Sequence, residues 1–239
     1  MSQSVDAALE SLCNDPGCCR ERLLHTAGIF YAERGDDAVS TRELTRAAGV
    51  NLAAIAYYFG GKNGLQAAVI EHVVAACRER TWEVFEHLSD AIERADGDPD
   101  QLAAATAAFA DAFLSAALPV NRETWWVSVV TRAMGNLPDR DAPLYETLFR
   151  PAHQILRQLV TAATGETDPD RVGILTEALA GDFLTFCKNY SVVLRSLGWD
   201  DFSDPHIDQI VAVVTRRMQA RLGLPQLPLA IGTAKLAAE

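Results

Sequence analysis

Residues 40–62, STRELTRAAGVNLAAIAYYFGGK, constrain the fold more than any other part of the chain. Ser40 followed by Glu43 is a capping box, in which a hydroxyl and a carboxylate satisfy the free amide groups of a helix start. Gly49 can adopt the left-handed conformation that ends a helix, and Asn51 can cap a second helix. The sequence therefore predicts two short helices joined by a tight turn.

The two predicted helices separate apolar from polar positions. The inward positions are Leu44, Ala47, Ala48, Leu52, Ile55 and Phe59. The outward positions are Arg42, Arg46, Ala53, Ala54 and Tyr57. Small outward residues beside an aromatic residue suit a helix that presses into a groove, so we expect a helix-turn-helix with residues 51–59 as its recognition helix.

This stretch carries a family resemblance. The matching residues are Thr41, Arg42, Ala48–Gly49, the run Tyr57–Tyr58–Phe59, Lys62 and Leu65. They resemble the DNA-binding domain of TetR-family transcriptional regulators, and AAIAYYFGGKNGL is similar to the CecR-like branch, which favours AAINYHFGGK here. Ala56 stands where that branch prefers Asn, so one expected contact is missing, and Tyr58 replaces a His but keeps a hydrogen-bonding ring.

The DNA contacts that we expect divide into two kinds. The full set is Thr41, Arg42, Arg46, Asn51, Ala53, Ala54, Tyr57, Tyr58 and Lys62. Lys62, Thr41 and Tyr58 are expected to meet phosphates. Because the middle of the outward face lacks Arg, Asn and Gln, base reading should depend on thymine methyl groups, Tyr57 and Arg42.

The charge of the chain is unevenly distributed. The formal net charge is −11, which is unusual for a nucleic-acid binder. Residues 20–65, however, hold six basic and five acidic residues, a balance of +1, whereas residues 66–239 hold 15 basic and 24 acidic residues, a balance of −9. This asymmetry permits local phosphate contacts and discourages nonspecific DNA binding by the rest of the chain.

Helical patterns follow one another from about residue 18 to residue 222, and nothing in the C-terminal half alternates long enough to indicate a sheet. An all-α fold is therefore expected, with the predicted helices over about 18–34, 41–48, 51–59, 62–94, 99–118, 122–135, 143–164, 169–197 and 205–222. Three Asp-Pro pairs, at 98–99, 168–169 and 204–205, mark helix starts. The expected domains are an arm at 1–17, a DNA-binding domain at 18–65, a helical effector-binding and dimerisation domain at 66–222 and an irregular tail at 223–239.

Aromatic residues are concentrated in the C-terminal helices. Either they form a helical core or, as the family resemblance implies, some line a cavity for a small-molecule effector. The residues expected to line it are Phe109, Phe113, Trp125, Trp126, Met134, Phe149, His153, Phe183, Phe186 and Tyr190. Polar residues that could orient a ligand there are Asp111, Arg132, His153, Asp182 and Asn189.

The last two predicted helices carry apolar and small residues that suit a helical bundle. The partner half of this bundle would come from a second subunit across a two-fold axis. The expected interface residues are Leu175, Leu179, Ile207, Ile210, Val211, Val214 and Met218. The alternative is that both helices pack only within their own chain.

Other kinds of site find little support. Cys13, Cys18 and Cys19 lie beside basic residues that could lower a thiol pKa, but adjacent cysteines fit the spacing of metal ligands poorly, and an unstructured arm is the simpler interpretation. No phosphate loop, G-x-S-x-G or H-E-x-x-H motif occurs, so we expect no enzyme activity, cofactor or metal. No membrane span or signal peptide is apparent, which predicts a cytoplasmic protein.

We therefore expect a homodimeric transcriptional regulator, most simply a repressor, that binds operator DNA and is released by a small-molecule effector of unknown identity. Two alternatives remain open. One is a helical small-molecule-binding protein or enzyme with a vestigial DNA-binding part, which the departure at Ala56 motivates. The other is a regulator controlled by a protein partner.

Overall fold

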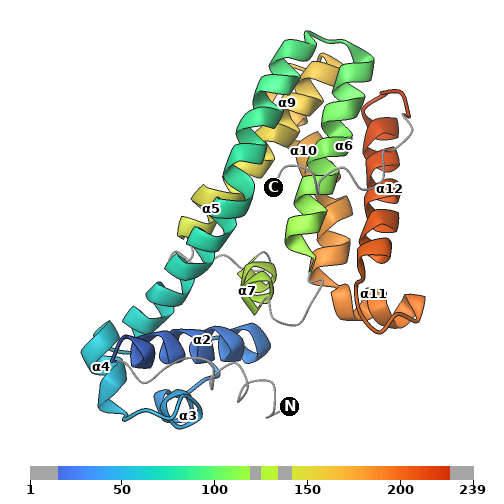
Figure 1. Cartoon of the computed structure of the whole chain (residues 1–239). Helices are drawn as coiled ribbons and strands as arrows, with labels where there is room; N and C mark the ends of the chain where they lie inside the picture. Colours follow the sequence, from blue (N-terminus) through green and yellow to red (C-terminus); the bar gives the residue numbers. More distant parts are fainter. Residues whose placement is uncertain (1–15, 119–124, 134–141, 227–239) are drawn as a thin grey trace. The chain divides into compact units, whose positions relative to one another are not determined.

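The computed structural model describes residues 16–118, 125–133 and 142–226 of the 239-residue chain. The regular structure in these ranges is helical throughout, as Figure 1 shows, which confirms the expected all-α class. Most of the expected arm at 1–17 lies outside the described residues, including Cys13, as do Met134 and the tail from residue 227.

The chain forms two compact units. Unit 1 comprises Met1–Ala75 and Thr124–Leu144, and unit 2 comprises Ala76–Glu123 and Tyr145–Glu239. The sequence analysis placed all of 66–222 in one C-terminal domain. The structure differs because a helix from the middle of the chain packs with the N-terminal helices.

In unit 1 the two short helices expected from the sequence pack against a longer helix. Its elements are α2 (Pro16–Arg34), α3 (Thr41–Ala47), α4 (Ala53–Phe59), the first part of α5 (Lys62–Ala95), α7 (Trp125–Ala133) and α8 (Ala142–Leu144). Helix α2 packs against α3, α4 and α7. Leu23, Leu44 and Leu65, from three different helices, are fully buried and form the centre of this core.

Helix α7 holds α2 at two places. The Trp125 ring lies so close to Gly28 that a Cβ atom at Gly28 would overlap it. Near the other end of α7, the Arg132 guanidinium donates hydrogen bonds to the carbonyl oxygens of Ala32 (2.9 Å) and Glu33 (3.0 Å), in the last turn of α2. These carbonyls have no partner inside their own helix, and a cation there also complements the helix dipole. A segment about one hundred residues away in sequence thus supports the base of the helix-turn-helix.

Unit 2 is a set of longer helices. They are the remainder of α5, α6 (Pro99–Ala117), the π-helical turn η2 (Tyr145–Phe149), α9 (Arg150–Thr164), α10 (Pro169–Lys188), α11 (Tyr190–Leu197) and α12 (Asp204–Arg221). Helix α6 packs against α12 and α9, and α10 packs against α9 and α12. Within unit 2, Figure 1 shows α6, α10 and α12 running alongside one another.

The expected Asp-Pro helix starts are present. The carboxylate of Asp98 accepts hydrogen bonds from the amides of Asp100 and Gln101, and Asp168 makes the equivalent pair with Asp170 and Arg171. At Asp204-Pro205 the cap is instead Ser203, one residue earlier. Proline at the first helical position has no amide to leave unsatisfied, which favours these starts.

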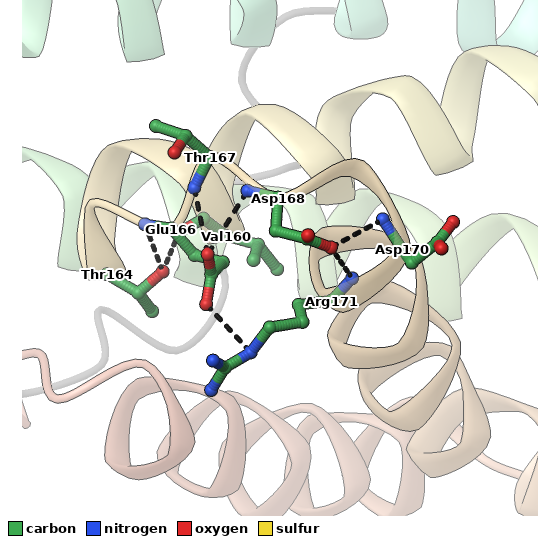
Figure 2. Close-up of polar contacts among 7 residues, drawn as sticks. All are labelled: Val160, Thr164, Glu166, Thr167, Asp168, Asp170 and Arg171. Carbon is green, nitrogen blue, oxygen red and sulfur yellow. Dashed lines mark hydrogen bonds and ion pairs between the residues drawn. The ribbon is translucent and has the colours of Figure 1, made fainter.

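The turn between α9 and α10 is closed by its own side chains (Figure 2). One carboxylate oxygen of Glu166 accepts hydrogen bonds from the amides of Thr167 and Asp168, both at 3.1 Å. Its other oxygen lies 3.0 Å from Nε of Arg171, and Asp168 in turn caps α10. Contacts among Glu166, Asp168 and Arg171 therefore stabilise this turn locally.

Two predicted helices are interrupted. Residues 143–164 form α8, η2 and α9, because Pro151 has no amide to donate to the preceding turn, and a widened turn forms just before it. Residues 169–197 break at Asn189, whose backbone leaves the helical region (φ −107°, ψ 26°), so that α10 ends and α11 begins. The helix expected over 122–135 is described only as α7.

We predict that Gly64→Ala severely destabilises unit 1. A Cβ atom at Gly64 would overlap the carbonyl oxygen of Phe59, and this neighbour is backbone that cannot rotate away. Overpacking costs roughly 1–3 kcal/mol, and we expect the upper end of that range. Chemical denaturation monitored by circular dichroism measures the loss.

The matched control is Gly173→Ala in α10. There a Cβ atom would make ordinary contact, 3.5 Å from the Arg157 side chain, so the change should be neutral or stabilise by up to about 1 kcal/mol through helix propensity. Equal effects of the two substitutions would show that the α4–α5 approach can relax.

Candidate nucleic-acid interface

Helices α3 and α4 form the predicted helix-turn-helix. Ser40 and Glu43 make the capping box: the Glu43 amide donates to the Ser40 hydroxyl (3.2 Å), and the Ser40 amide donates to the Glu43 carboxylate (3.0 Å). Gly49 has a positive φ of 63°, as the turn requires. The Asn51 side chain accepts a hydrogen bond from the Ala53 amide (2.9 Å), but the N-cap position of α4 is Leu52, which makes no side-chain cap. Helix α4 begins two residues later than expected, at Ala53.

All nine predicted DNA-contact residues lie at the surface. Exposed are Arg42, Arg46, Asn51, Ala53 and Tyr57, and half-buried are Thr41, Ala54, Tyr58 and Lys62. Tyr57 is the most prominent, with 82% of its surface exposed. Leu44, Ala48 and Ile55 are buried, as predicted. The prediction for Leu52 was wrong, since it is 48% exposed in the turn that precedes α4.

The aromatic residues at the end of α4 contact one another edge to face. The ring centroids of Tyr57 and Tyr58 are 4.9 Å apart, and those of Tyr58 and Phe59 are 6.5 Å apart. Gly60 and Gly61 follow with positive φ values of 70° and 126°, and α5 starts at Lys62. The exposed Tyr57 ring thus contacts the Tyr58 ring near a sharp change of chain direction.

Some of the basic side chains on this surface are paired with an acidic group and others are not. Arg34 forms an ion pair with Glu43 at 3.2 Å. Hydrogen bonds from the Ser40 amide and hydroxyl, together with the Arg34 guanidinium, lower the pKa of Glu43 to about 2. No ion pair to Arg42, Arg46 or Lys62 occurs within the part of the chain that the structure describes. Three cations therefore remain available to an anionic partner.

The residues predicted to line an effector cavity are divided between the two units. Trp125 and Trp126 belong to unit 1, where Trp125 stacks on His72 (5.6 Å) and contacts His25 edge-on (6.1 Å). In unit 2, Phe109 and Phe183 are 0% and 2% exposed, with ring centroids 5.6 Å apart. This burial places both rings in the core of unit 2.

The remaining predicted cavity residues of unit 2 are less enclosed. Phe149 is buried, whereas Phe113, His153, Phe186 and Tyr190 retain exposed surface. His153 is already engaged: Nδ1 lies 2.6 Å from the Phe149 carbonyl oxygen and Nε2 lies 3.2 Å from the Glu177 carboxylate. Phe113 contacts Phe183 at 5.0 Å and so connects the core to this surface.

The polar residues suggested as ligand-orienting groups mostly have structural partners. Asp182 of α10 binds Arg217 (2.9 Å) and Arg221 (3.1 Å) of α12, and Arg132 caps α2. Asp111 accepts a hydrogen bond from Ser115, and burial, with the nearby Asp208 carboxylate adding to it, raises its pKa. Asn189 is the exposed residue at the α10–α11 break.

Most of the predicted dimer residues pack within the single chain. Buried there are Leu179, Ile207, Ile210, Val211, Val214 and Met218. Helix α12 turns this face toward α6 of its own chain, which is the alternative that the sequence left open. Leu175 is exposed, together with Ile174 and Val213 on the same two helices.

None of the described cysteines forms a disulfide. Cys18, Cys77 and Cys187 are buried, and burial raises the pKa of Cys187 to about 12. Over the described ranges, no three His, Cys, Asp or Glu side chains gather as metal ligands would. None of the described helices has the length and apolar run that a bilayer crossing needs.

Two family models match the chain. The model for the N-terminal region of bacterial regulatory proteins of the TetR family matches residues 23–69, over α3 and α4, and the model for the C-terminal domain of the HTH-type transcriptional dual regulator CecR matches residues 103–223. The protein is a TetR-family transcriptional regulator of the CecR-like branch. The family hits and relatives are regulators and not enzymes.

Similar proteins agree with this assignment. The HTH-type transcriptional dual regulator CecR of Shigella flexneri is 28% identical over 220 residues, which cover 88% of this chain and 94% of that protein. Two solved structures share the fold: a HlyIIR mutant (TM-score 0.54, 14% identity, covering 85% of this chain and 98% of that chain) and SCO3833 of Streptomyces coelicolor A3 (TM-score 0.54, 18% identity, 87% and 91%).

The sequence analysis named Trp125 and Arg132 but missed their role in tertiary packing, and it did not name Gly64. Trp125 and Arg132 support α2, and Gly64 permits the close approach of α5 to α4. Gly64 lies inside the family-like run AAIAYYFGGKNGL, so its conformational role could have been suspected. Nothing local indicated that α7 would join unit 1.

We predict that the stabilisation due to Glu43 depends on pH in a specific direction. Its pKa in the folded state, about 2, lies below the ordinary value of 4.5, so its contribution is fully present above pH 4.5 and is lost as pH falls toward 2. The stability difference between wild type and Glu43→Gln should therefore be constant near neutral pH and shrink on acidification. Thermal unfolding of both proteins across this pH range provides the measurement.

The control is Glu71→Gln, which removes an exposed α5 carboxylate that has no hydrogen bond to the described residues. Its difference from wild type should not follow the same pH course. A Glu43→Gln difference that is independent of pH would contradict the capping-box explanation.

Proposed function

We propose that the protein is a homodimeric, sequence-specific DNA-binding repressor whose operator affinity is controlled by a small molecule bound in unit 2. The observation that carries this proposal is the surface of α3 and α4, which is anchored by a buried apolar face and presents unneutralised cations beside an exposed tyrosine. Such a surface suits the major groove, with α4 as the recognition helix. Binding of chromosomal DNA implies a cytoplasmic protein.

Seven of the nine surface residues have distinct proposed roles. Lys62, Thr41 and Tyr58 bind phosphates and fix the register of α4 on the duplex. Tyr57 and Arg42 read base edges, and Ala53 and Ala54 contact thymine methyl groups. Ala56 is exposed on α4 and supplies no hydrogen bond, so specificity depends on fewer polar contacts than in the rest of the branch.

The dimer interface that we propose is an exposed stripe on α10. Ile174, Ala178, Gly181 and Thr185 are spaced so that they share one face of the helix, and all four are exposed. A Cβ atom at Gly181 would meet nothing within 4 Å, so another helix can approach closely. Val213 of α12 is also exposed, and the Arg217–Asp182 ion pair holds α12 against α10. This stripe replaces the buried α12 residues that the sequence indicated.

The effector site that we propose lies near the partly exposed aromatic side chains of unit 2, Phe113, Phe186 and Tyr190. Aromatic surface of this kind binds an apolar or aromatic ligand, because burying it against the ligand removes it from water. The fully buried pair Phe109 and Phe183 would form the floor of such a site.

A base-reading residue and a phosphate-binding residue should differ in how their substitution affects affinity for operator and for random DNA. Tyr57→Ala should cost roughly 1–3 kcal/mol on the operator and much less on random DNA. Lys62→Ala should weaken binding about equally on both and lower the salt slope by about one for each bound subunit. Fluorescence anisotropy with a duplex selected from a random library, and with an unselected duplex of equal length, provides the test.

Equal losses on both duplexes for Tyr57→Ala would remove it from the specificity residues. Tyr57→Phe is the control for the ring alone, since it retains the edge-to-face contact with Tyr58 and deletes only the hydroxyl. Failure of the wild-type protein to select any sequence, at moderate salt, would favour a vestigial DNA-binding part over the proposed regulator.

The α10 stripe predicts the effect of Ile174→Glu. Ile174 is 69% exposed in the single chain, so a carboxylate there leaves the subunit fold intact. In a two-fold interface each subunit contributes one such carboxylate, so two charges are buried on dimerisation. Dimerisation should weaken more than about tenfold, which corresponds to about 1.4 kcal/mol. Analytical ultracentrifugation over a concentration series measures this change.

Val192→Glu is the matched control, because Val192 on α11 is 66% exposed and lies outside the stripe. It should leave the association constant unchanged. If Val192→Glu dissociates the dimer and Ile174→Glu does not, the interface is on α11 instead of α10.

A further inference from the structure

Arg20 of α2 lies over an aromatic ring at the end of the recognition helix. Its guanidinium carbon lies 5.3 Å from the centroid of the Phe59 ring, within the range of a cation–π contact. Phe59 is the last residue of α4 and is half-buried, whereas Arg20 is exposed. The contact therefore places a surface cation from a different helix next to the proposed DNA-binding surface.

This position continues the aromatic row at the end of α4. Phe59 contacts Tyr58, and Tyr58 contacts Tyr57, with the centroid distances given above. Arg20 lies at one end of the row and the exposed Tyr57 ring at the other. Lys62 follows Phe59 after only two glycines, so Arg20 and Lys62 flank the same turn.

The charge of Arg20 is not neutralised by its surroundings. No carboxylate of the described residues pairs with it, in contrast to Arg34, which is bound to Glu43. An arginine that stacks uses the face of its guanidinium and leaves the N–H groups at the edge of the plane free. Those edge donors match the geometry of two phosphate oxygens.

We propose that Arg20 is a further DNA-contact residue, which binds a backbone phosphate beside the half-site that α4 reads, with Phe59 as the platform that orients it. This inference rests on the proposed DNA-binding function and adds a contact from outside α3 and α4. Stacking holds the guanidinium in one orientation before DNA arrives, so less side-chain freedom is lost on binding. The contact positions the protein on the duplex and carries no sequence information.

A purely structural role for the same contact makes different predictions. If Arg20 only helped to hold α2 against α4, its removal would lower stability and leave the salt dependence of DNA binding unchanged. A phosphate contact contributes directly to counterion release, so its loss changes the slope of log affinity against log salt. The salt slope is therefore the measurement that separates the two roles.

The experiment compares Arg20→Ala, Arg20→Lys and the control Arg94→Ala with the wild-type protein. Arg94 is an exposed arginine in the unit 2 part of α5, so its replacement changes net charge equally without touching unit 1. The probes are a duplex selected from a random library and an unselected duplex of the same length. Anisotropy titrations at several potassium chloride concentrations give both affinity and slope, and circular dichroism confirms the fold of each variant.

Arg20→Ala should weaken binding to both duplexes by similar factors, several-fold at moderate salt, and lower the slope by about one per bound subunit. Arg20→Lys should keep the slope, because the charge remains, and lose part of the affinity, because the planar stack is gone. Arg94→Ala should match the wild-type protein in both respects.

The platform role of Phe59 has its own test. In a Phe59→Leu background, Arg20→Ala should cause a smaller loss of affinity than in the wild type, since the guanidinium is no longer oriented. A double-mutant cycle measures this coupling. Equal losses in the two backgrounds would overturn the platform role.

The proposal as a whole is overturned if Arg20→Ala leaves affinity and slope at the Arg94→Ala values, or if it changes which sequence is preferred. The first result would make the stacking a packing contact only, and the second would make Arg20 a base-reading residue. If the wild-type protein itself binds neither duplex, the proposed function fails before the role of Arg20 is in question.

Discussion

The helix-turn-helix depends on the contact between α7 and α2. Only a glycine at position 28 allows the Trp125 ring to lie against the α2 backbone, and the Arg132 guanidinium binds the carbonyls at the end of the same helix. Helix α2 then packs against both α3 and α4. Two short helices could not hold their positions alone, because helices of this length are marginal in water and gain stability from tertiary packing. The orientation of the DNA-binding surface is therefore set by a segment that lies far away in the sequence.

How far the sequence could predict this structure depended on the range of each interaction. The cap at Ser40 was predictable because its partner Glu43 lies only three positions away. Trp125 was expected among the C-terminal aromatic residues but belongs to unit 1. Its aromatic character indicates burial but not which core will bury it. The same limit explains α12: the stripe from Ile207 to Met218 reads identically whether α6 of the same chain or a second subunit covers it. The predicted burial of Leu52 was wrong for a local reason, since the helix begins after this residue.

The charge pattern reconciles an acidic protein with a DNA-binding surface. A net charge of −11 repels DNA at long range, so binding requires that the few local cations stay available. Glu43 is the carboxylate of α3 that could neutralise these cations. It is instead bound to the Ser40 cap and to Arg34. Arg42, Arg46 and Lys62 keep their charge open, and Arg20 adds a fourth cation held in place by an aromatic ring instead of an acid. Stacking fixes an arginine without neutralising it, which an ion pair cannot do.

The path of the chain between the two units limits how an effector could act. The chain passes from unit 2 into α7 after Glu123 and returns to unit 2 at Tyr145, so α7 is joined to unit 2 by its backbone at both ends while its side chains hold α2. A ligand that favours one arrangement of unit 2 can change operator affinity only if it binds the two states differently. Moving the protein from almost fully bound to almost fully released requires about 5.5 kcal/mol of such a difference. Linkage is reciprocal, so saturating operator DNA must weaken effector binding by the same factor. A compound that binds unit 2 with equal affinity in the presence and absence of operator is therefore not the effector, however tightly it binds.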